Sequence, residues 1–311
     1  MRIIETLVTS KVGGDEGTSI ARRLWPVDKL LLFYLGITWL LIAVYSRQIP
    51  GAKWLLLAHA GAALLIIVIA KKFVSPLSLL FRHWYPALIV PALYKEMSVL
   101  IPALRATAMD ETLARLDYAI WGVNPTVWLE RVQHPLLTEY LQFIYSMFMP
   151  AFILVGALYW LKRPLAEFRY YGFLVVLGFL VSYIGYFLVP ARGPRFILAH
   201  LHSTDLQGLW TYQWFRDTLD SLEGVHYDCF PSGHTQMTIL AWWSCRQLSR
   251  TAFYAFGFFT LCQIFSTVYL RYHYSVDLMA GFIFAVVLLL VTPRLYAALE
   301  KGDGSNVSPS L

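Results

Sequence analysis

Long apolar runs, separated by short polar segments, dominate the chain. An α-helix needs about 20 apolar residues to cross the hydrocarbon layer of a bilayer. Most of the runs reach or approach that length: roughly 29–46, 53–70, 138–161, 170–190, 235–248, 252–270 and 274–292. The pattern therefore predicts an all-α integral membrane protein, built as a polytopic helical bundle.

One further stretch, residues 84–104, leaves two interpretations open. It contains three prolines and the charged pair Lys95 and Glu96, and its apolar part from Trp84 to Tyr94 is too short to span a bilayer. It is either a re-entrant or interfacial element, or a broken spanning helix.

The remaining segments are polar. Residues 105–137 interleave charged residues with Trp121 and Trp128, which is typical of an amphipathic helix on a membrane surface. Residues 191–230 form a long polar loop containing Trp210 and Trp214, and loops of that length are often functional. The expected organisation is a polar N-terminal tail (1–28), N-terminal transmembrane and re-entrant helices (29–104), an amphipathic surface cap (105–137), a catalytic transmembrane core (138–294) and a disordered C-terminal tail (295–311).

Composition agrees with a membrane protein. Hydrophobic residues make up 58% of the 311 residues and charged residues only 14%, against about 25% charged residues in a soluble domain. The net charge of +6 does not indicate nucleic-acid binding, because the basic residues occur singly or in pairs between apolar runs. If 84–104 spans, alternate faces carry 15 and 10 Lys and Arg residues. The positive-inside rule then places both termini in the cytoplasm and loops 191–234 and 271–273 on the non-cytoplasmic face.

Three short polar clusters stand out at the ends of the apolar runs. They are Ala191-Arg192-Gly193-Pro194-Arg195, Phe230-Pro231-Ser232-Gly233-His234-Thr235 and Arg271-Tyr272-His273-Tyr274-Ser275-Val276-Asp277. In an alternating topology, the end of one run, the start of the next and the last hairpin lie on the same side of the membrane. We therefore expect the three clusters to converge, and ionisable residues at membrane depth are usually functional.

The residue types in these clusters suit phosphoryl transfer. His273 and Asp277 are four residues apart, so on a helix they contact one another. An aspartate that accepts one imidazole N–H leaves the other nitrogen free to attack phosphorus. His234, at the start of a helix, could donate a proton to the leaving oxygen.

Phosphate-binding groups are also present. Arg192 and Arg195 are bidentate donors for phosphate oxygens. The free amides of the helix start at Ser232 and Gly233 would hold an anion, and the glycine leaves room for its approach.

Other classes of function use some of the same residues. A transporter could use His234, His273 and Asp277 as a proton relay, but their position at helix ends argues against it. A metal-dependent hydrolase could use the same three residues as ligands. The spacing of His200 and His202 also suits a metal, but no carboxylate or cysteine completes that set.

At these clusters the sequence resembles the type 2 phosphatidic acid phosphatase (PAP2) superfamily, whose motifs are a basic stretch ending in Arg-Pro, then Pro-Ser-Gly-His, then an Arg-rich segment with His-x-x-x-Asp. Pro231–His234 match the second motif in full, and His273 and Asp277 match the third. The resemblance covers roughly 170–292. It implies a six-helix core, with one or two additional N-terminal helices, in which His273 is the nucleophile and His234 protonates the leaving group. It implies no metal or other cofactor.

Two departures from the family pattern bear on the substrate. The first motif is replaced by Arg192-Gly193-Pro194-Arg195, and Thr267 stands where the third motif usually has an arginine, so Arg271 or Arg195 would complete the phosphate site. The segment from Tyr269 to Gly281 is similar to the inositol phosphorylceramide synthase branch.

The expected function is a lipid-phosphate phosphatase acting on a lipid or lipid-linked phosphate in the bilayer. The alternative is a phosphotransferase that moves a phosphorylated headgroup to a lipid or polyol. The oligomeric state is left open.

Overall fold

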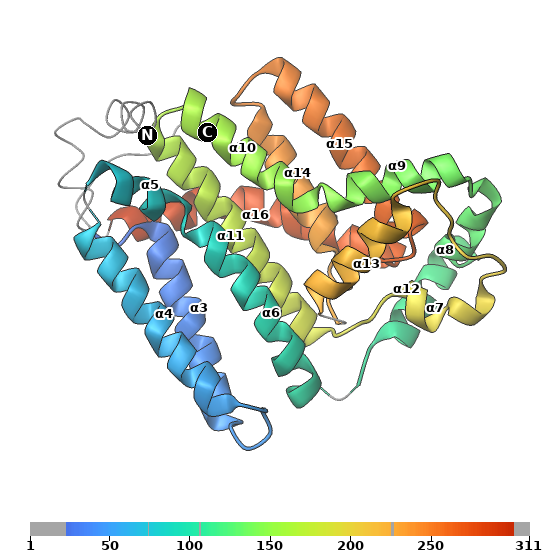
Figure 1. Cartoon of the computed structure of the whole chain (residues 1–311), viewed down its shortest axis with the longest axis horizontal. Coiled ribbons are helices and arrows are strands. Elements are labelled where there is room, and N and C mark those ends of the chain that lie inside the picture. Colours follow the sequence, from blue (N-terminus) through green and yellow to red (C-terminus); the bar gives the residue numbers. More distant parts are fainter. Residues whose placement is uncertain (1–22, 74, 106, 225–226, 302–311) are drawn as a thin grey trace. The chain divides into compact units, whose positions relative to one another are not determined.

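The computed structural model describes residues 23–73, 75–105, 107–224 and 227–301, and these residues form helices and no strand (Figure 1). They divide into two compact units. The first combines the residues up to Leu93 with Pro164–Leu177 and the segment from Val291, and the second combines Tyr94–Arg163 with Gly178–Leu290. All of the motif residues singled out from the sequence lie in the second unit.

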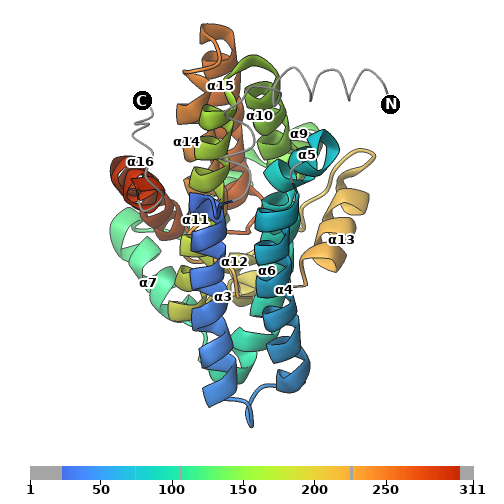
Figure 2. The ribbon, with the colours of Figure 1, turned by 90° about the vertical axis from the view of Figure 1, so that its left-hand side faces the viewer.

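The first unit contains a helical hairpin of α3 (Pro26–Val44) and α4 (Ala52–Lys72), which lie side by side in both views (Figures 1 and 2). Gly51 precedes α4 with a φ of +69°, a conformation that glycine adopts without strain. Helix α5 (Pro76–Trp84) contributes Arg82, whose side chain is fully buried 3.5 Å from Asp28. A buried charge requires such a partner.

Six helices are long and apolar enough to cross a membrane, or seven if one bent pair counts as a single span, among the residues the structure describes. They are α3, α4, Ser78–Leu104, α11 (Leu165–Leu188), α15 (Arg250–Tyr269) and α16 (Ser275–Lys301). The prediction of a multi-pass helical membrane protein is confirmed. Residues 84–104 belong to the span Ser78–Leu104 and are not a separate short element. Tyr85, between α5 and α6 (Pro86–Leu104), keeps right-handed helical dihedrals, so the prolines do not end the helix.

Two other apolar runs differ from a simple span. The run 138–161 is broken into α9 (Pro135–Ser146) and α10 (Phe148–Lys162), which meet at 50°. Pro150 lacks an N–H and its ring clashes with the carbonyl four residues earlier, which explains a break at this point. Helix α14 (Gly233–Cys245) has 13 residues, fewer than a straight span requires.

The second unit surrounds the motif residues with short helices. Between α11 and α14 lie α12 (Pro194–Ile197), η2 (Ala199–Leu201) and α13 (Tyr212–Glu223), and α13 packs on α9. The segment expected to form the cap folds as α7 (Asp110–Trp121), α8 (Pro125–Trp128) and η1 (Leu129–Val132). Helix α16 continues to Lys301, into the stretch expected to be a C-terminal tail. Residues 1–22 and 302–311 of the two expected tails lie outside the described residues.

Candidate active site

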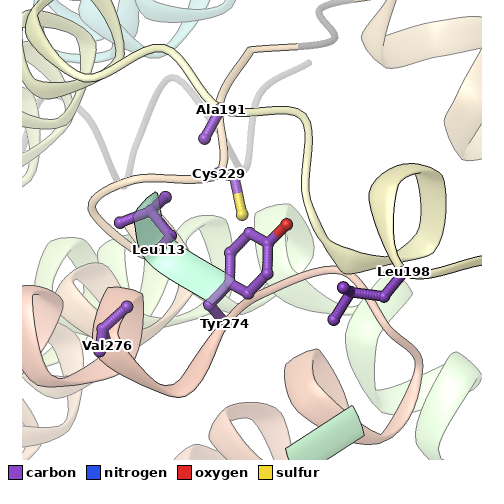
Figure 3. Close-up of a cluster of buried hydrophobic side chains, with 6 residues drawn as sticks. All are labelled: Leu113, Ala191, Leu198, Cys229, Tyr274 and Val276. Atoms are coloured by element: carbon purple, nitrogen blue, oxygen red, sulfur yellow. The ribbon is translucent and has the colours of Figure 1, made fainter. Parts of the chain in front are cut away.

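The structure brings the three polar clusters together through backbone hydrogen bonds. The amide of Cys229 donates to the carbonyl of Ala191 at 3.1 Å, which joins the segment before α14 to the segment after α11. The amide of Arg195 donates to the carbonyl of Arg271 at 2.9 Å, and that of Ser232 to the carbonyl of Asp277 at 3.0 Å. Figure 3 shows Cys229 and Ala191 beside Tyr274 in a buried cluster that also contains Leu113, Leu198 and Val276.

The orientation of His273 follows from its neighbours. Its Nδ1 lies 2.8 Å from the carbonyl oxygen of Cys229 and 3.4 Å from Oδ2 of Asp277. A backbone carbonyl only accepts hydrogen bonds, so we assign the imidazole proton to Nδ1. Nε2 then carries a lone pair, as a nucleophile requires. Nε2 faces Nδ1 of His234 at 3.4 Å.

Asp277 occupies the first turn of α16 and is completely buried. Its Oδ2 accepts hydrogen bonds from the amide of Tyr274 at 2.8 Å and from the thiol of Cys229 at 2.9 Å. The close approach of His273 to Asp277 that the sequence predicts is therefore present, although His273 lies just before α16 and not on it, and additional donors fix the carboxylate.

Aromatic rings fix His234. Tyr145, at the end of α9, stacks on the His234 ring with centroids 4.4 Å apart, and Phe148, at the start of α10, lies 4.1 Å from it. Tyr145 also stacks on Tyr272 at 4.3 Å, and the guanidinium of Arg195 lies 4.8 Å above the Tyr272 ring. The break between α9 and α10 thus places two aromatic side chains against the candidate general acid.

The helix start expected to bind phosphate is partly satisfied by its own residues. The hydroxyl of Ser232 accepts a hydrogen bond from the amide of Thr235 at 3.2 Å, as an N-cap residue does. A Cβ at position 233 would lie 2.2 Å from the hydroxyl oxygen of Tyr186, so a side chain there would force the Tyr186 ring to move. Packing therefore favours Gly233, whatever its role toward phosphate.

The three candidate arginines have different surroundings. Arg192 is exposed. Arg195 pairs with Asp220 of α13 at 2.7 Å. Arg271 is buried and donates to Oε1 of Glu130 at 3.0 Å and to the carbonyl of Thr204 at 2.7 Å, so its guanidinium binds the cap and the long loop.

Glu130 connects η1 of the cap to the long loop. It accepts hydrogen bonds from the amide and hydroxyl of Ser203 and pairs with His202 at 2.8 Å. Burial raises the pKa of Glu130, but these hydrogen bonds and the charge of Arg271 outweigh it, so that the pKa lies below its usual range. His202, one of two histidines considered for metal binding, is thus paired with a carboxylate.

Sequence reasoning missed two cap acids that organise the site. Asp110 is buried and accepts hydrogen bonds from the amides of Arg192 and Gly193 and from the hydroxyl of Tyr274. Asp117, seven residues later on the same face of α7, accepts from the amides of Ser275 and Val276 at the start of α16. The i,i+7 spacing places both acids on one helix face and was the available signal.

Arg216 of α13 was also missed. It is half-buried and donates to the hydroxyl of Tyr212 at 3.3 Å. It adds a further cation near Arg195 and Arg271.

Thr267 stands where the third motif usually has an arginine. Its carbonyl oxygen accepts hydrogen bonds from the amides of Tyr272 and His273.

One group of side chains could hold a metal ion, among the residues the structure describes: Cys229, His273 and Asp277, whose donor atoms lie within 4.8 Å of one another. It differs from the set considered from the sequence, because Cys229 takes the place of His234. The same atoms are engaged with one another in hydrogen bonds, so the arrangement is equally that of a hydrogen-bonded histidine–aspartate pair.

Of three comparisons with known proteins, one gives a match. A search of curated proteins and a search of solved structures found no match. A family model does match, over residues 111–291, a range that includes most of the cap, all three polar clusters and therefore His234 and His273. Since that range is more than half of the chain, the protein belongs to the PAP2 superfamily.

Proposed function

We propose that this protein is a membrane phosphatase that cleaves phosphate from a lipid or lipid-linked phosphate through a phosphohistidine intermediate. Membership of the superfamily supports a phosphatase or phosphotransferase type of enzyme. The observation that carries the proposal is the environment of His273. Its Nδ1 faces two acceptors, the carbonyl of Cys229 and the carboxylate of Asp277, and the thiol of Cys229 lies nearby. Its Nε2 faces His234.

The reaction takes two steps. Nε2 of His273 attacks phosphorus, the bond from phosphorus to the lipid oxygen breaks, and protonated His234 donates its proton to the departing oxygen. Neutral His234 then removes a proton from water, whose oxygen attacks phosphorus and breaks the P–N bond. Inorganic phosphate leaves and both histidines return to their starting states.

The two rings must separate for substrate to bind. Their facing nitrogens are at hydrogen-bonding distance, 3.4 Å, and a phosphoryl group does not fit between them. Nδ1 of His273 is fixed by Cys229 and Asp277, whereas the His234 ring is held by stacking on Tyr145 and by contact with the tilted ring of Phe148. We therefore expect His234 to be the ring that moves.

A phosphotransferase remains the second candidate, and one observation favours it. The cap contains a groove of about 640 Å³ lined by aromatic and polar side chains, including Tyr118, Trp128, Glu130 and Ser203. Aromatic faces beside a carboxylate and a hydroxyl suit a polyol, and Glu130 joins this groove to Arg271. An alcohol held there would replace water in the second step.

The test is phosphate release from a panel of lipid phosphates by the purified protein in EDTA. Wild type, His273→Ala and His234→Ala are compared, and His200→Ala, an exposed histidine of the long loop, is the control. We expect release by wild type and the control and none by the two variants. Radiolabelled phosphate should remain on wild-type protein after an acid-free quench, and not on His273→Ala. Release that is unchanged in His273→Ala would refute the proposal. Transfer to added polyols in place of release would select the phosphotransferase.

A further inference from the structure

Cys229 contacts both members of the histidine–aspartate pair. Its Sγ lies 2.9 Å from Oδ2 of Asp277 and 3.6 Å from Nδ1 of His273, and its carbonyl oxygen lies 2.8 Å from the same Nδ1. The side chain is buried, and its own amide is fixed by the carbonyl of Ala191. No other residue with a hydrogen bond to the pair, among those described, uses both its backbone and its side chain.

The direction of the thiol hydrogen bond follows from its partners. A carboxylate oxygen accepts, so the S–H of Cys229 donates to Asp277. The alternative acceptor, the carbonyl of Tyr272, is farther away at 3.3 Å. Burial and the charge of Asp277 raise the pKa of the thiol well above its ordinary value, so it stays protonated at neutral pH. Cys229 is therefore a hydrogen-bond donor and not a competing nucleophile.

The thiol acts on the carboxylate oxygen that faces the imidazole. Oδ2 of Asp277 receives the amide of Tyr274 on one side and the thiol on the other, and it lies 3.4 Å from Nδ1 of His273. Two donors on one oxygen fix the rotation of the carboxylate. Without the thiol, the Tyr274 amide would be the one remaining donor of this pair, and the carboxylate could rotate so that Oδ2 no longer faces the imidazole.

We propose that Cys229 is a positioning residue for the His273–Asp277 pair, whose thiol sets the orientation of the carboxylate and whose carbonyl sets the imidazole tautomer, without touching the substrate. The inference rests on the proposed phosphohistidine mechanism. As Nε2 attacks phosphorus, positive charge develops on the imidazole, and a correctly aimed carboxylate stabilises it.

Substitutions of Cys229 leave the carbonyl in place and so test the thiol alone. In Cys229→Ala we expect kcat to fall about 10- to 100-fold, the size expected for a lost hydrogen bond to a charged group, with KM unchanged. Cys229→Ser retains a donor and should restore most of the activity. Cys245→Ala is the matched control, because Cys245 is another buried cysteine, on α14.

Two results would overturn the inference: wild-type kcat in Cys229→Ala, or a serine variant as impaired as the alanine variant. Thermal unfolding in detergent shows whether each variant is folded. A readout independent of turnover is the ¹⁵N spectrum of histidine-labelled protein, in which the His273 signal is identified by its loss in His273→Ala. Cys229→Ala should shift that signal and Cys245→Ala should not. If wild type releases no phosphate and forms no phosphoenzyme, the proposed function fails, whereas the spectrum still decides the role of Cys229.

Discussion

Asp110 of the cap should control the activity of a site from which it is distant in sequence. Its carboxylate accepts the amide of Arg192 at 3.0 and 2.9 Å, the amide of Gly193 at 2.8 Å and the hydroxyl of Tyr274 at 3.1 Å. The first two donors belong to the segment that carries the candidate phosphate-binding arginines. Asp110→Ala removes the acceptor for all three donors.

The cost can be worked from these contacts. A buried donor left without its acceptor costs roughly 1–3 kcal/mol. Water can reach the exposed Arg192, but Gly193 and Tyr274 are buried, so their two unpaired donors together cost roughly 2–6 kcal/mol. Folded domains are stable by about 5–15 kcal/mol, so the protein should still fold while this segment loses its fixed position. Each 1.4 kcal/mol is about tenfold, so a loss of at least about 2 kcal/mol predicts a fall in kcat/KM of about 30-fold or more.

The assay is lipid-phosphate hydrolysis in detergent, together with thermal unfolding. Glu111→Ala is the matched control, because Glu111 is the neighbouring acid on α7 and is exposed. Asp110→Asn keeps one acceptor oxygen and should retain more activity than Asp110→Ala. If Asp110→Ala has a kcat/KM close to wild type, the segment is held by other contacts and the reasoning is wrong.

Three further predictions follow from other contacts. The pKa of Glu130 is lowered in the folded protein, so its carboxylate stabilises the fold fully above about pH 4.3, and this stabilisation is lost as the pH falls through the lower folded pKa. Glu130→Gln should therefore lower the melting temperature at neutral pH, and the difference in melting temperature from wild type should shrink below about pH 4. Tyr145→Leu removes the ring that stacks on His234 and should lower kcat about tenfold with a smaller effect on KM, whereas Tyr140→Leu, at an exposed position on the same helix, should not. Activity that vanishes in EDTA and returns with a divalent cation would contradict the phosphohistidine mechanism, for which we expect activity to be unchanged by the chelator.

Much of the membrane architecture was predictable from the sequence, because hydrophobic length is a direct physical requirement of a bilayer. The spans at α3, α4, α11, α15 and α16 follow the apolar runs closely. Two of the departures concern prolines. Pro150 breaks the run 138–161, whereas Pro86 begins α6 without ending the helical path from α5. A proline at the first turn of a helix is tolerated, and its effect depends on the residue before it, which the hydropathy pattern does not reveal.

The convergence of the two candidate histidines was also predictable, whereas the groups that hold them were not. The i,i+4 spacing of His273 and Asp277 predicts their contact on a shared helix, but His273 lies two residues before α16, so the contact depends on the turn that leads into the helix. Cys229 has no such pattern, since a single cysteine before a helix usually indicates a small core residue. Asp110 and Asp117 lie in the segment that the sequence predicts to be an amphipathic surface helix, and acids on such helices are usually exposed. Here the acidic face of α7 is buried, and Leu116, Ile120 and Trp121 are exposed.

The basic residues illustrate why pairing need not prevent phosphate binding. At rest Arg195 donates from Nη1 to Asp220, and Arg271 donates from Nη2 to Glu130 and Thr204. An arginine has five N–H donors in a fixed plane, so one carboxylate partner leaves others available and restricts where they point. The carboxylates therefore orient the guanidinium groups in advance and reduce the conformational entropy that a phosphate would otherwise have to overcome. By this reasoning Asp220→Asn should weaken substrate binding, seen as a higher KM at similar kcat, although it removes a negative charge from the neighbourhood of an anionic substrate. A lower KM would show that Asp220 acts as a competitor of the phosphate and not as a guide for Arg195.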